Sequence, residues 1–242
     1  MSLDDNHKNL YENPLWQEID SSFLHPGGID STKELLAAAD LASHSKILDL
    51  GCGRGCTVQW LMENTSYSPY GLDISSALLA GSGNLYEICH FKQGSCHNMP
   101  YDDDFFDALL CECSFSLFQP HEMALQEMKR VLKPNGQVII SDFYFLDRQG
   151  EISWPLNTCL KGALTYDGWQ SLFQVNNFHN LLFLDKNQLY KRLLVDIIMK
   201  FGSLNAFWQA INEDSCPNCL GESLFRGSYK LSYFHGIWQI DQ

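Results

Sequence analysis

The chain has 242 residues, enough to bury one full hydrophobic core, and no low-complexity linker divides it. We therefore expect one domain with a small appended region. Its 16 basic and 29 acidic residues give a net charge of −13, which repels nucleic-acid phosphates and anionic lipid surfaces, so neither is an expected partner. Nine scattered cysteines and a polar start without an apolar signal region predict a reducing cytoplasm. No run approaches about 18 apolar residues, so no membrane span is expected.

The first 45 residues are predicted to hold a lid and one helix. An aromatic cluster favours a short segment packed over the core, through Tyr11, Trp16 and Phe23. A Pro-Gly-Gly break follows at residues 26–28, and Asp30 or Ser31 is expected to cap a helix. The apolar face of this helix is expected to contain Leu35, Leu36, Ala39 and Leu41.

Residues 47–57 carry the strongest chemical pattern in the chain. An apolar strand ends at Leu50, glycines follow at every second position, and a helical pattern begins near Val58. Glycine lets the backbone turn tightly and lie against a ligand, so the amides at the helix start can face a bound group. The pattern predicts a strand-turn-helix cradle for a cofactor, built on Gly51, Gly53 and Gly55.

A nicotinamide-binding fold begins with a similar turn, and the glycine spacing separates the two. The dinucleotide fingerprint G-x-G-x-x-G places its third glycine where this chain has Cys56. Asp49 would also repel a pyrophosphate, whereas it would attract the amino group of a sulfonium cofactor. The pattern therefore favours S-adenosylmethionine over a nicotinamide dinucleotide.

A second acid follows at the end of the next predicted strand, residues 70–74. Asp73 lies 24 residues past Asp49, a spacing that suits a carboxylate accepting both ribose hydroxyls of a nucleoside. The alternative is a helix cap, with Asp73 or Ser75 serving the next helix.

Two further strand ends are expected at the same edge of the sheet. Residues 91–100 predict a strand that runs into a loop at Ser95 and Cys96, and residues 106–110 predict a buried strand. The latter continues through Glu112 and Cys113, at the point where open α/β sheets place their ligands. We expect residues here to face the group that reacts.

The rest of the chain predicts alternating helices and strands. A helix with its apolar face at Ala124, Met128 and Val131 ends near Pro134, and a β-branched strand covers 137–143. Beyond residue 145 the pattern predicts helices at 155–163, 166–173 and 188–201 and strands at 181–184 and 231–240.

Four ordered motifs resemble class I methyltransferases over about residues 26–200. They are the D-x-G-x-G turn at 49–53, the acid at 73, the loop and F-D strand start around 95–107, and R-V-L-K-P-N-G at 130–136. The resemblance implies an α/β fold with a Rossmann-like, seven-stranded, mostly parallel sheet, helices on both faces and a small helical lid and C-terminal region. It also implies a single domain, 1–242, with a cofactor-binding half at about 26–145 and a substrate half with the last strands at about 146–242.

The same resemblance implies S-adenosylmethionine as cofactor and S-adenosylhomocysteine as product. Ser95 stands where the family usually has an acid, which leaves a hydroxyl and the Cys96 amide for adenine. A segment near Gly28 closes over the cofactor in such enzymes. The implied cofactor-binding residues are Asp49, Gly51, Cys52, Gly53, Asp73, Ile74, Ser95, Cys96 and Glu112.

The expected acceptor is a small molecule, and two groups within the family are similar to this chain. The overall arrangement resembles quinone-biosynthesis methyltransferases, whereas the stretch around Cys159 resembles arsenite methyltransferases, in which a cysteine binds the metalloid. Cys216 and Cys219 are the later cysteines that could join Cys159, or form half of a metal site completed by Cys159 or His235. The sequence names neither the acceptor nor the oligomeric state.

Catalytic roles remain open at this stage among Glu112, Cys113 and Cys159. A hydroxyl or carbon acid needs a base, for which His97, His121 and Glu112 are candidates, while a soft acceptor held by thiolates needs none. A cofactor-binding protein without catalysis and a nicotinamide-dependent oxidoreductase are the alternative functions. Packing is the expected role of the remaining cysteines, Cys52, Cys56, Cys89 and Cys111.

Overall fold

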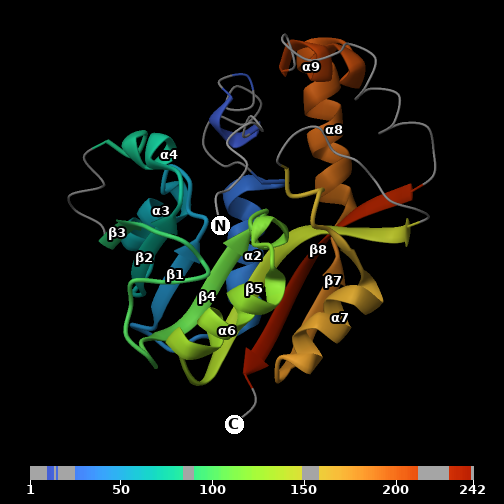
Figure 1. Cartoon of the computed structure of the whole chain (residues 1–242). Coiled ribbons are helices and arrows are strands. Elements are labelled where there is room, and N and C mark those ends of the chain that lie inside the picture. Colours follow the sequence, from blue (N-terminus) through green and yellow to red (C-terminus); the bar gives the residue numbers. More distant parts are fainter. Residues whose placement is uncertain are drawn as a thin grey trace.

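The computed structural model describes residues 10–13, 15, 25–83, 90–148, 158–211 and 229–240. Its centre is a sheet whose strands lie in the order β3-β2-β1-β4-β5-β8-β7, and the two-residue β6 pairs with β5 (Figure 1). The seven predicted strands all lie on this path. Their bounds are β1 Lys46–Leu50, β2 Ser68–Asp73, β3 His90–Gln93, β4 Phe106–Glu112, β5 Leu132–Arg148, β6 Leu164–Thr165, β7 Phe178–Asp185 and β8 Tyr229–Ile240.

The sheet is parallel from β3 to β5 and antiparallel around β8. β8 pairs antiparallel with both β5 and β7, so the last strand in the sequence lies between two earlier ones. Both faces of the parallel strands β1 and β4 are buried, so their sequences are nearly continuous apolar runs. This architecture confirms the predicted α/β fold with a mostly parallel sheet.

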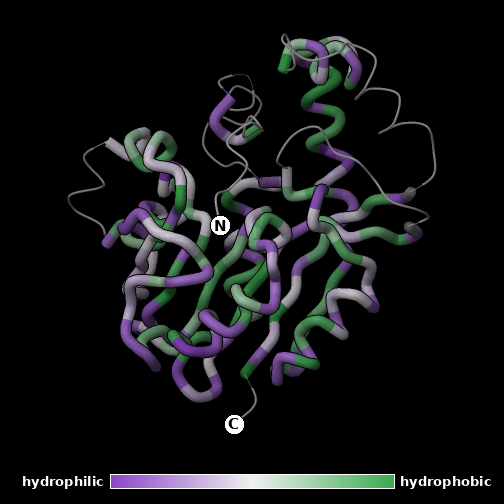
Figure 2. Tube along the Cα trace, viewed as in Figure 1, coloured by the Kyte–Doolittle hydropathy of each residue, from purple (hydrophilic) through white to green (hydrophobic). Residues whose placement is uncertain are grey.

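Helices cover both faces of the sheet because alternate strand residues point to opposite sides. α6 (His121–Val131) and α7 (Tyr166–Val175) pack on the face that carries Leu109 and Val138. α2 (Gly28–Ala39) and α3 (Cys56–Asn64) pack on the other face, against Ala108 and Ile139. Figure 2 shows hydrophobic residues concentrated along the central strands between these layers.

The remaining helices gather near the carboxyl ends of the parallel strands. α4 (Ser76–Ala80) follows β2, and the one-turn η2 (Phe115–Leu117) follows β4. α8 (Asn187–Phe201) carries α9 (Leu204–Ile211) at its far end (Figure 1). The short η1 (Leu10–Glu12) packs against both, with Leu10 beside Ile197 and Phe207. Within the described ranges, every helix is too short or too polar to span a bilayer.

Four details of the predicted elements differ in the structure. α2 begins at Gly28 after Gly27, without a side-chain cap, and Ser31 instead binds His235 across the core at 2.8 Å. Residues 158–163 form turns where a helix was predicted, and Gly162 packs so closely against the Ser116 carbonyl oxygen that a Cβ there would lie 1.8 Å from it. Leu41 lies beyond the end of α2, and α9 was not predicted.

Two predictions lie wholly or partly outside the described residues. The first is the aromatic cluster, of which Trp16 and Phe23 are not described. The second is the predicted helix at 155–163, of which residues 155–157 are not described. Tyr11 of the same cluster is described, and it is buried in η1.

Candidate functional site

The sheet changes its winding direction between β1 and β4, and the predicted cofactor residues gather at that point. The helix after β1, α3, packs on one face, whereas the helix after β4, α6, packs on the other. Neighbouring strands whose helices leave in opposite directions leave a crevice at their carboxyl ends, where α/β folds bind ligands. Asp49, Asp73 and Glu112 all lie at this edge.

The glycine turn after β1 has the backbone geometry that its sequence predicted. Gly51, Gly53 and Gly55 have positive φ angles of 83°, 55° and 77°. A Cβ on Gly51 would lie 2.6 Å from the Cβ of Ser114, so the turn passes directly against the end of β4. A Cβ on Gly55 would lie 2.2 Å from the Phe91 ring, so the third glycine is required by packing beneath the turn.

Asp73 supports the glycine turn as well as standing at the tip of β2. Its two carboxylate oxygens accept the Gly53 and Ser75 backbone N–H groups, each at 2.8 Å. Burial raises the pKa of Asp73, against the lowering effect of these two hydrogen bonds. A carboxylate oxygen has two acceptor positions, so both oxygens retain capacity for further donors. Ser75 itself caps α4 by accepting the Leu78 N–H at 3.1 Å, which confirms the cap that its position predicted.

Asp49 and Glu112 place buried negative charge beside the turn. Asp49 is 4% exposed, and burial raises its pKa well above the usual value, with further increases from the charges of Glu112 and Asp73. Clustered acids of this kind are stabilised when a positively charged group binds between them.

Glu112 connects three segments that are distant in the sequence. Its Oε1 accepts the Thr32 hydroxyl of α2 at 2.8 Å, and its Oε2 accepts the Thr57 hydroxyl of α3 at 3.0 Å. The Nε2 atom of His25 lies 3.5 Å from the same Oε2, and both side chains are almost fully buried. The predicted candidate base is thus a carboxylate held by hydroxyl groups, between the glycine turn and the segment that leads into α2.

The loop after β3 brings the remaining predicted cofactor residues to the same edge. Ser95 and Cys96 are half-buried, and the Ser95 hydroxyl accepts the His97 N–H at 3.2 Å. Ile74 follows Asp73 directly and is 55% exposed, which leaves an apolar surface beside the ribose position proposed below.

Two histidines that were candidate bases contact backbone carbonyls. The Nε2 atom of His97 lies 3.3 Å from the Phe118 oxygen. His121 stacks on Phe115 with ring centroids 5.2 Å apart, and its Nε2 lies 3.5 Å from the Ser116 oxygen. Burial lowers the pKa of His121, which favours the neutral imidazole in this packed position.

Cys113 follows β4 with a backbone angle that non-glycine residues rarely adopt, a φ of 51°. Its N–H donates to the Ser141 oxygen at 2.7 Å, which holds the residue against β5. Strain of this kind persists only where surrounding contacts enforce it, and it concentrates at functional sites. Burial raises the pKa of the Cys113 thiol well above its usual value, and the neighbouring Cys159 adds to the increase.

Cys113 also lines a cavity of about 80 Å³. Cys159 and Phe143 lie in the same wall, and the helices η1, α8 and α9 supply most of the rest. None of the described lining residues is basic or acidic. The apolar members of the lining are Leu10, Pro26, Phe143, Leu160, Leu193, Leu194, Ile197, Leu204 and Leu231.

The comparisons with known proteins agree with this geometry. Residues 48–140 match a family model described as a methyltransferase domain. The chain is 27% identical to methyltransferase GfsG of Streptomyces halstedii, over 75% of this chain and 65% of that protein. It is also similar in structure to Haemonchus contortus phosphoethanolamine N-methyltransferase 2 in complex with S-adenosyl-L-methionine, with a TM-score of 0.74 at 14% identity, over 94% of this chain and 56% of that chain. Residues 48–140 thus match a methyltransferase domain, and the comparisons together support a class I S-adenosylmethionine-dependent methyltransferase.

The relatives and structural neighbours differ in length and in the reactions that their names give. Phosphoethanolamine N-methyltransferase 3 of Arabidopsis thaliana is 30% identical over 125 residues, half of this chain but only 26% of that protein. The [4+2]-cyclase SpnF has a similar fold, with a TM-score of 0.71 at 16% identity, over 94% of this chain and 92% of that one. The fold is therefore shared by proteins that catalyse different reactions.

Two features of the methyltransferase site could not be read from local sequence patterns. Cys113 and Cys159 lie together in the cavity wall, and Asp142 of β5 lies beside them. The sequence did hold one signal for Asp142. It directly follows the β-branched run that predicted β5, and β5 lies next to β4 in the sheet. Cys216 and Cys219 lie outside the described residues, so their proposed pairing with Cys159 stays a prediction, and Cys89 also lies outside them.

Among the cysteines predicted to serve packing, Cys52 and Cys111 are buried in hydrophobic clusters, as expected. Cys56 is half-buried in the first turn of α3.

Proposed function

We propose that this methyltransferase transfers the methyl group of S-adenosylmethionine to a small molecule bound in the cavity beside Cys113. One observation carries the proposal: three consecutive residues at the end of β4 connect the glycine turn to the cavity. Glu112 binds Thr57 at the start of α3, Ser114 packs against Gly51, and Cys113 between them lines the cavity. A donor on the turn and an acceptor in the cavity would therefore be neighbours.

The residues around the turn fit the cofactor by shape and by charge. Gly51 leaves no room for a side chain, and the buried carboxylate of Asp49 suits the amino group of the methionine end. Asp73 has acceptor capacity for ribose hydroxyls, and the exposed Ile74 offers an apolar surface to adenine. We assign cofactor binding to the full predicted set, Asp49, Gly51, Cys52, Gly53, Asp73, Ile74, Ser95, Cys96 and Glu112.

The cofactor supplies an activated methyl group on a sulfonium, and the protein's main task is alignment. In-line displacement requires the acceptor atom, the methyl carbon and the sulfur to be collinear, and holding them so removes most of the entropic barrier. The hydroxyls of Thr32 and Thr57 orient Glu112 between the two binding regions. The apolar cavity excludes water and positions the body of the acceptor.

The cavity lining favours an uncharged acceptor with an apolar body. A phosphate ester needs basic side chains or a helix N-terminus, and the described lining residues include no base. We therefore expect the acceptor to differ from phosphoethanolamine, the substrate named for several relatives. The substrate half of the chain is proposed to be residues 146–242, with α8 and α9 as its lid.

A soft acceptor held by thiolates is the second candidate. This candidate is supported by the position of Cys159 beside Cys113 in the cavity wall. Cys113 could therefore be the second thiol, a role for which the sequence analysis considered Cys216 and Cys219. Arsenite is the test compound for this class, because trivalent arsenic binds pairs of thiols. Arsenite-dependent turnover that Cys159→Ser abolishes would favour this candidate.

The test of the proposed function separates binding from catalysis. Calorimetry with S-adenosylmethionine measures binding, and release of S-adenosylhomocysteine is followed with quinols, amines, thiols, arsenite and phosphoethanolamine. Binding with turnover on an uncharged acceptor is the expected result. Binding without turnover on any compound would favour a cofactor-binding protein, and turnover on phosphoethanolamine would contradict the proposed acceptor class.

A further inference from the structure

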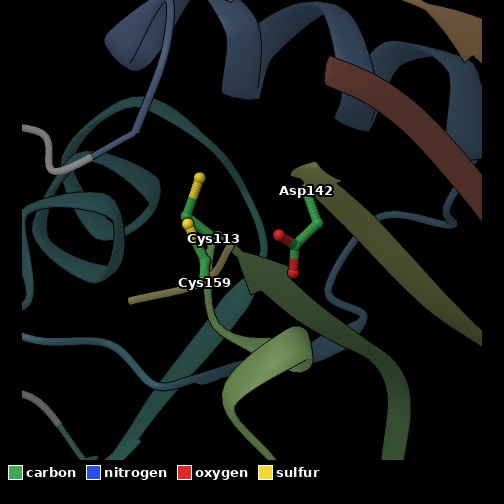
Figure 3. Close-up of side chains that lie close together, drawn as sticks. All are labelled: Cys113, Asp142 and Cys159. Atoms are coloured by element: carbon green, nitrogen blue, oxygen red, sulfur yellow. The ribbon is translucent and has the colours of Figure 1, made fainter. Parts of the chain in front are cut away.

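Three side chains from separate segments converge at the inner wall of the cavity. Cys113 follows β4, Asp142 lies in β5, and Cys159 belongs to the turn at 158–163. One sulfur or oxygen atom from each lies within 4.8 Å of the others, and all three residues are buried. Figure 3 shows the two sulfur atoms side by side, with the carboxylate of Asp142 directed toward them.

Asp142 is the unusual member of this cluster. It is fully buried, and its oxygens accept hydrogen bonds from neutral donors: the Ser116 N–H at 3.0 Å, the Ser116 hydroxyl at 2.9 Å and the Phe143 N–H at 2.7 Å. These bonds fix the direction of the carboxylate. None of them supplies a positive charge, and burying a carboxylate without one is costly. A cation between Asp142 and the two thiols would provide that charge.

We propose that Cys113, Asp142 and Cys159 form a binding site for a thiophilic divalent cation, with Zn²⁺ as the occupant. Two sulfurs and one carboxylate oxygen are a donor set that zinc accepts, with bonds of about 2.3 Å to sulfur and about 2.0 Å to oxygen. Tetrahedral bonds of those lengths place the donor atoms roughly 3.5 to 3.8 Å apart, so from at most 4.8 Å the cluster has to contract by about 1.3 Å at most. On binding, both thiols release their protons to solvent.

The fourth coordination position is the functionally important one. Three protein ligands leave one site open, the arrangement found in catalytic zinc centres. Cys113 and Cys159 both line the cavity, so the open position faces the space proposed for the acceptor. The cation would lower the pKa of an acceptor thiol or hydroxyl bound there, which would release its proton to solvent and become a nucleophile without a protein base. The binding of the cation itself goes beyond the proposed function and does not depend on it.

The experiment uses Co²⁺ as a spectroscopic probe for the full-length protein. Because Cys216 and Cys219 form a separate C-x-x-C pair, the background variant carries Cys216→Ser and Cys219→Ser. In this background we expect sulfur-to-cobalt charge transfer in the near ultraviolet, ligand-field bands of a tetrahedral site, and displacement of both by Zn²⁺. Cys113→Ser and Cys159→Ser should each abolish the charge transfer or reduce it by about half, and Cys111→Ser, a buried cysteine of the same strand, should leave it unchanged.

The carboxylate distinguishes this proposal from a metalloid site made by the thiols alone. Asp142→Asn should weaken Co²⁺ affinity at least tenfold and leave arsenite affinity unchanged. Circular dichroism of each variant reports whether it is folded, and the cysteine variants test the proposal independently if Asp142→Asn does not fold. Absence of charge transfer in the background variant, or bands of undiminished intensity in both Cys113→Ser and Cys159→Ser, would overturn the proposal.

Discussion

Asp73 connects two segments at the carboxyl edge of the sheet through one carboxylate. One oxygen accepts the Gly53 N–H of the glycine turn, and the other accepts the Ser75 N–H at the start of the next segment. The side chain that is proposed to bind ribose thus also holds the turn that is proposed to bind the methionine end. Substitution here should therefore affect the cofactor through direct contact and through the shape of the turn.

We predict that Asp73→Ala weakens S-adenosylmethionine binding by tenfold or more. A hydrogen bond to a charged group contributes about 1.5–3 kcal/mol, and the loosened turn adds to the loss. Isothermal calorimetry measures the change. Asp107→Ala is the matched control, because Asp107 also accepts a backbone N–H, that of Lys46 at 2.8 Å, but lies at the opposite end of its strand. Equal affinity of Asp73→Ala and wild type would remove Asp73 from the site.

His235 should give the protein a specific sensitivity to acid. It is 1% exposed in β8, and burial, followed by the charge of Lys186, lowers its pKa to about 4. Glu34, which opposes this shift, and His25 also face it, and Ser31 binds its Nε2.

The sign of the effect follows from proton uptake. Between pH about 6.5 and pH about 4 the unfolded chain binds a proton at this histidine that the native state does not bind. The free energy of unfolding should therefore fall as the pH is lowered through this window, by up to about 3 kcal/mol from this group. Urea unfolding of His235→Gln between pH 4.5 and 7.5 should show a smaller slope than wild type. An unchanged slope would contradict the assignment.

At the scale of the element, the glycine turn depends on both backbone angle and free space. Gly51 and Gly83 share positive φ angles, 83° and 58°, but differ in their surroundings. A Cβ at Gly51 would meet Ser114, whereas a Cβ at Gly83 would meet no atom within 4 Å. The two positions therefore separate backbone strain from steric overlap.

We predict that Gly83→Ala costs about 1 kcal/mol of stability and Gly51→Ala costs about 1–3 kcal/mol more. Only the second variant should also weaken S-adenosylmethionine binding, because Ser114 would have to move away from the turn. Chemical denaturation and calorimetry provide the two measurements. Equal losses in both variants would mean that the turn has room for a side chain.

At the scale of the whole molecule, the last strand completes the core. β8 pairs with β5 and β7, and its Trp238 stacks on Phe173 of α7 with ring centroids 4.3 Å apart. Phe234, also of β8, stacks on Phe183 at 4.4 Å. Phe115, which follows β4, packs on Phe173 with ring centroids 5.3 Å apart, so this aromatic packing joins both halves of the chain. We therefore expect the molecule to unfold as one unit.

Trp238→Ala should destabilise the whole protein by about 3–5 kcal/mol, since it leaves a large cavity between the sheet and α7. Trp60→Ala provides the comparison, because Trp60 is only partly buried on α3 and should cost less. Thermal unfolding followed by circular dichroism measures both. Two separate transitions in Trp238→Ala would show that the halves fold independently and would contradict the single-domain assignment.

Local sequence patterns determined the strands, most helices and the glycine turn. Apolar runs, glycine spacing and strand-end acids depend on backbone geometry and burial within a few residues, so the turn at 51–55 and the acids Asp49 and Asp73 could be predicted. The net charge of −13 likewise follows from composition alone. Ser75 could be predicted as a cap because capping is a contact between near neighbours.

The tertiary structure alone decided the contacts between distant segments. Glu112 meets Thr32 and Thr57, and Cys113 meets Cys159, because strand register and helix packing bring their elements together. The structure also has turns at 158–163 where local propensity predicted a helix, and Gly162 in this segment packs directly against the Ser116 carbonyl. Sequence periodicity indicates which face of an element is buried, but the fold decides which residues of other elements pack on that face. The contacts of Glu112 and Cys113 in the candidate site are of this second kind.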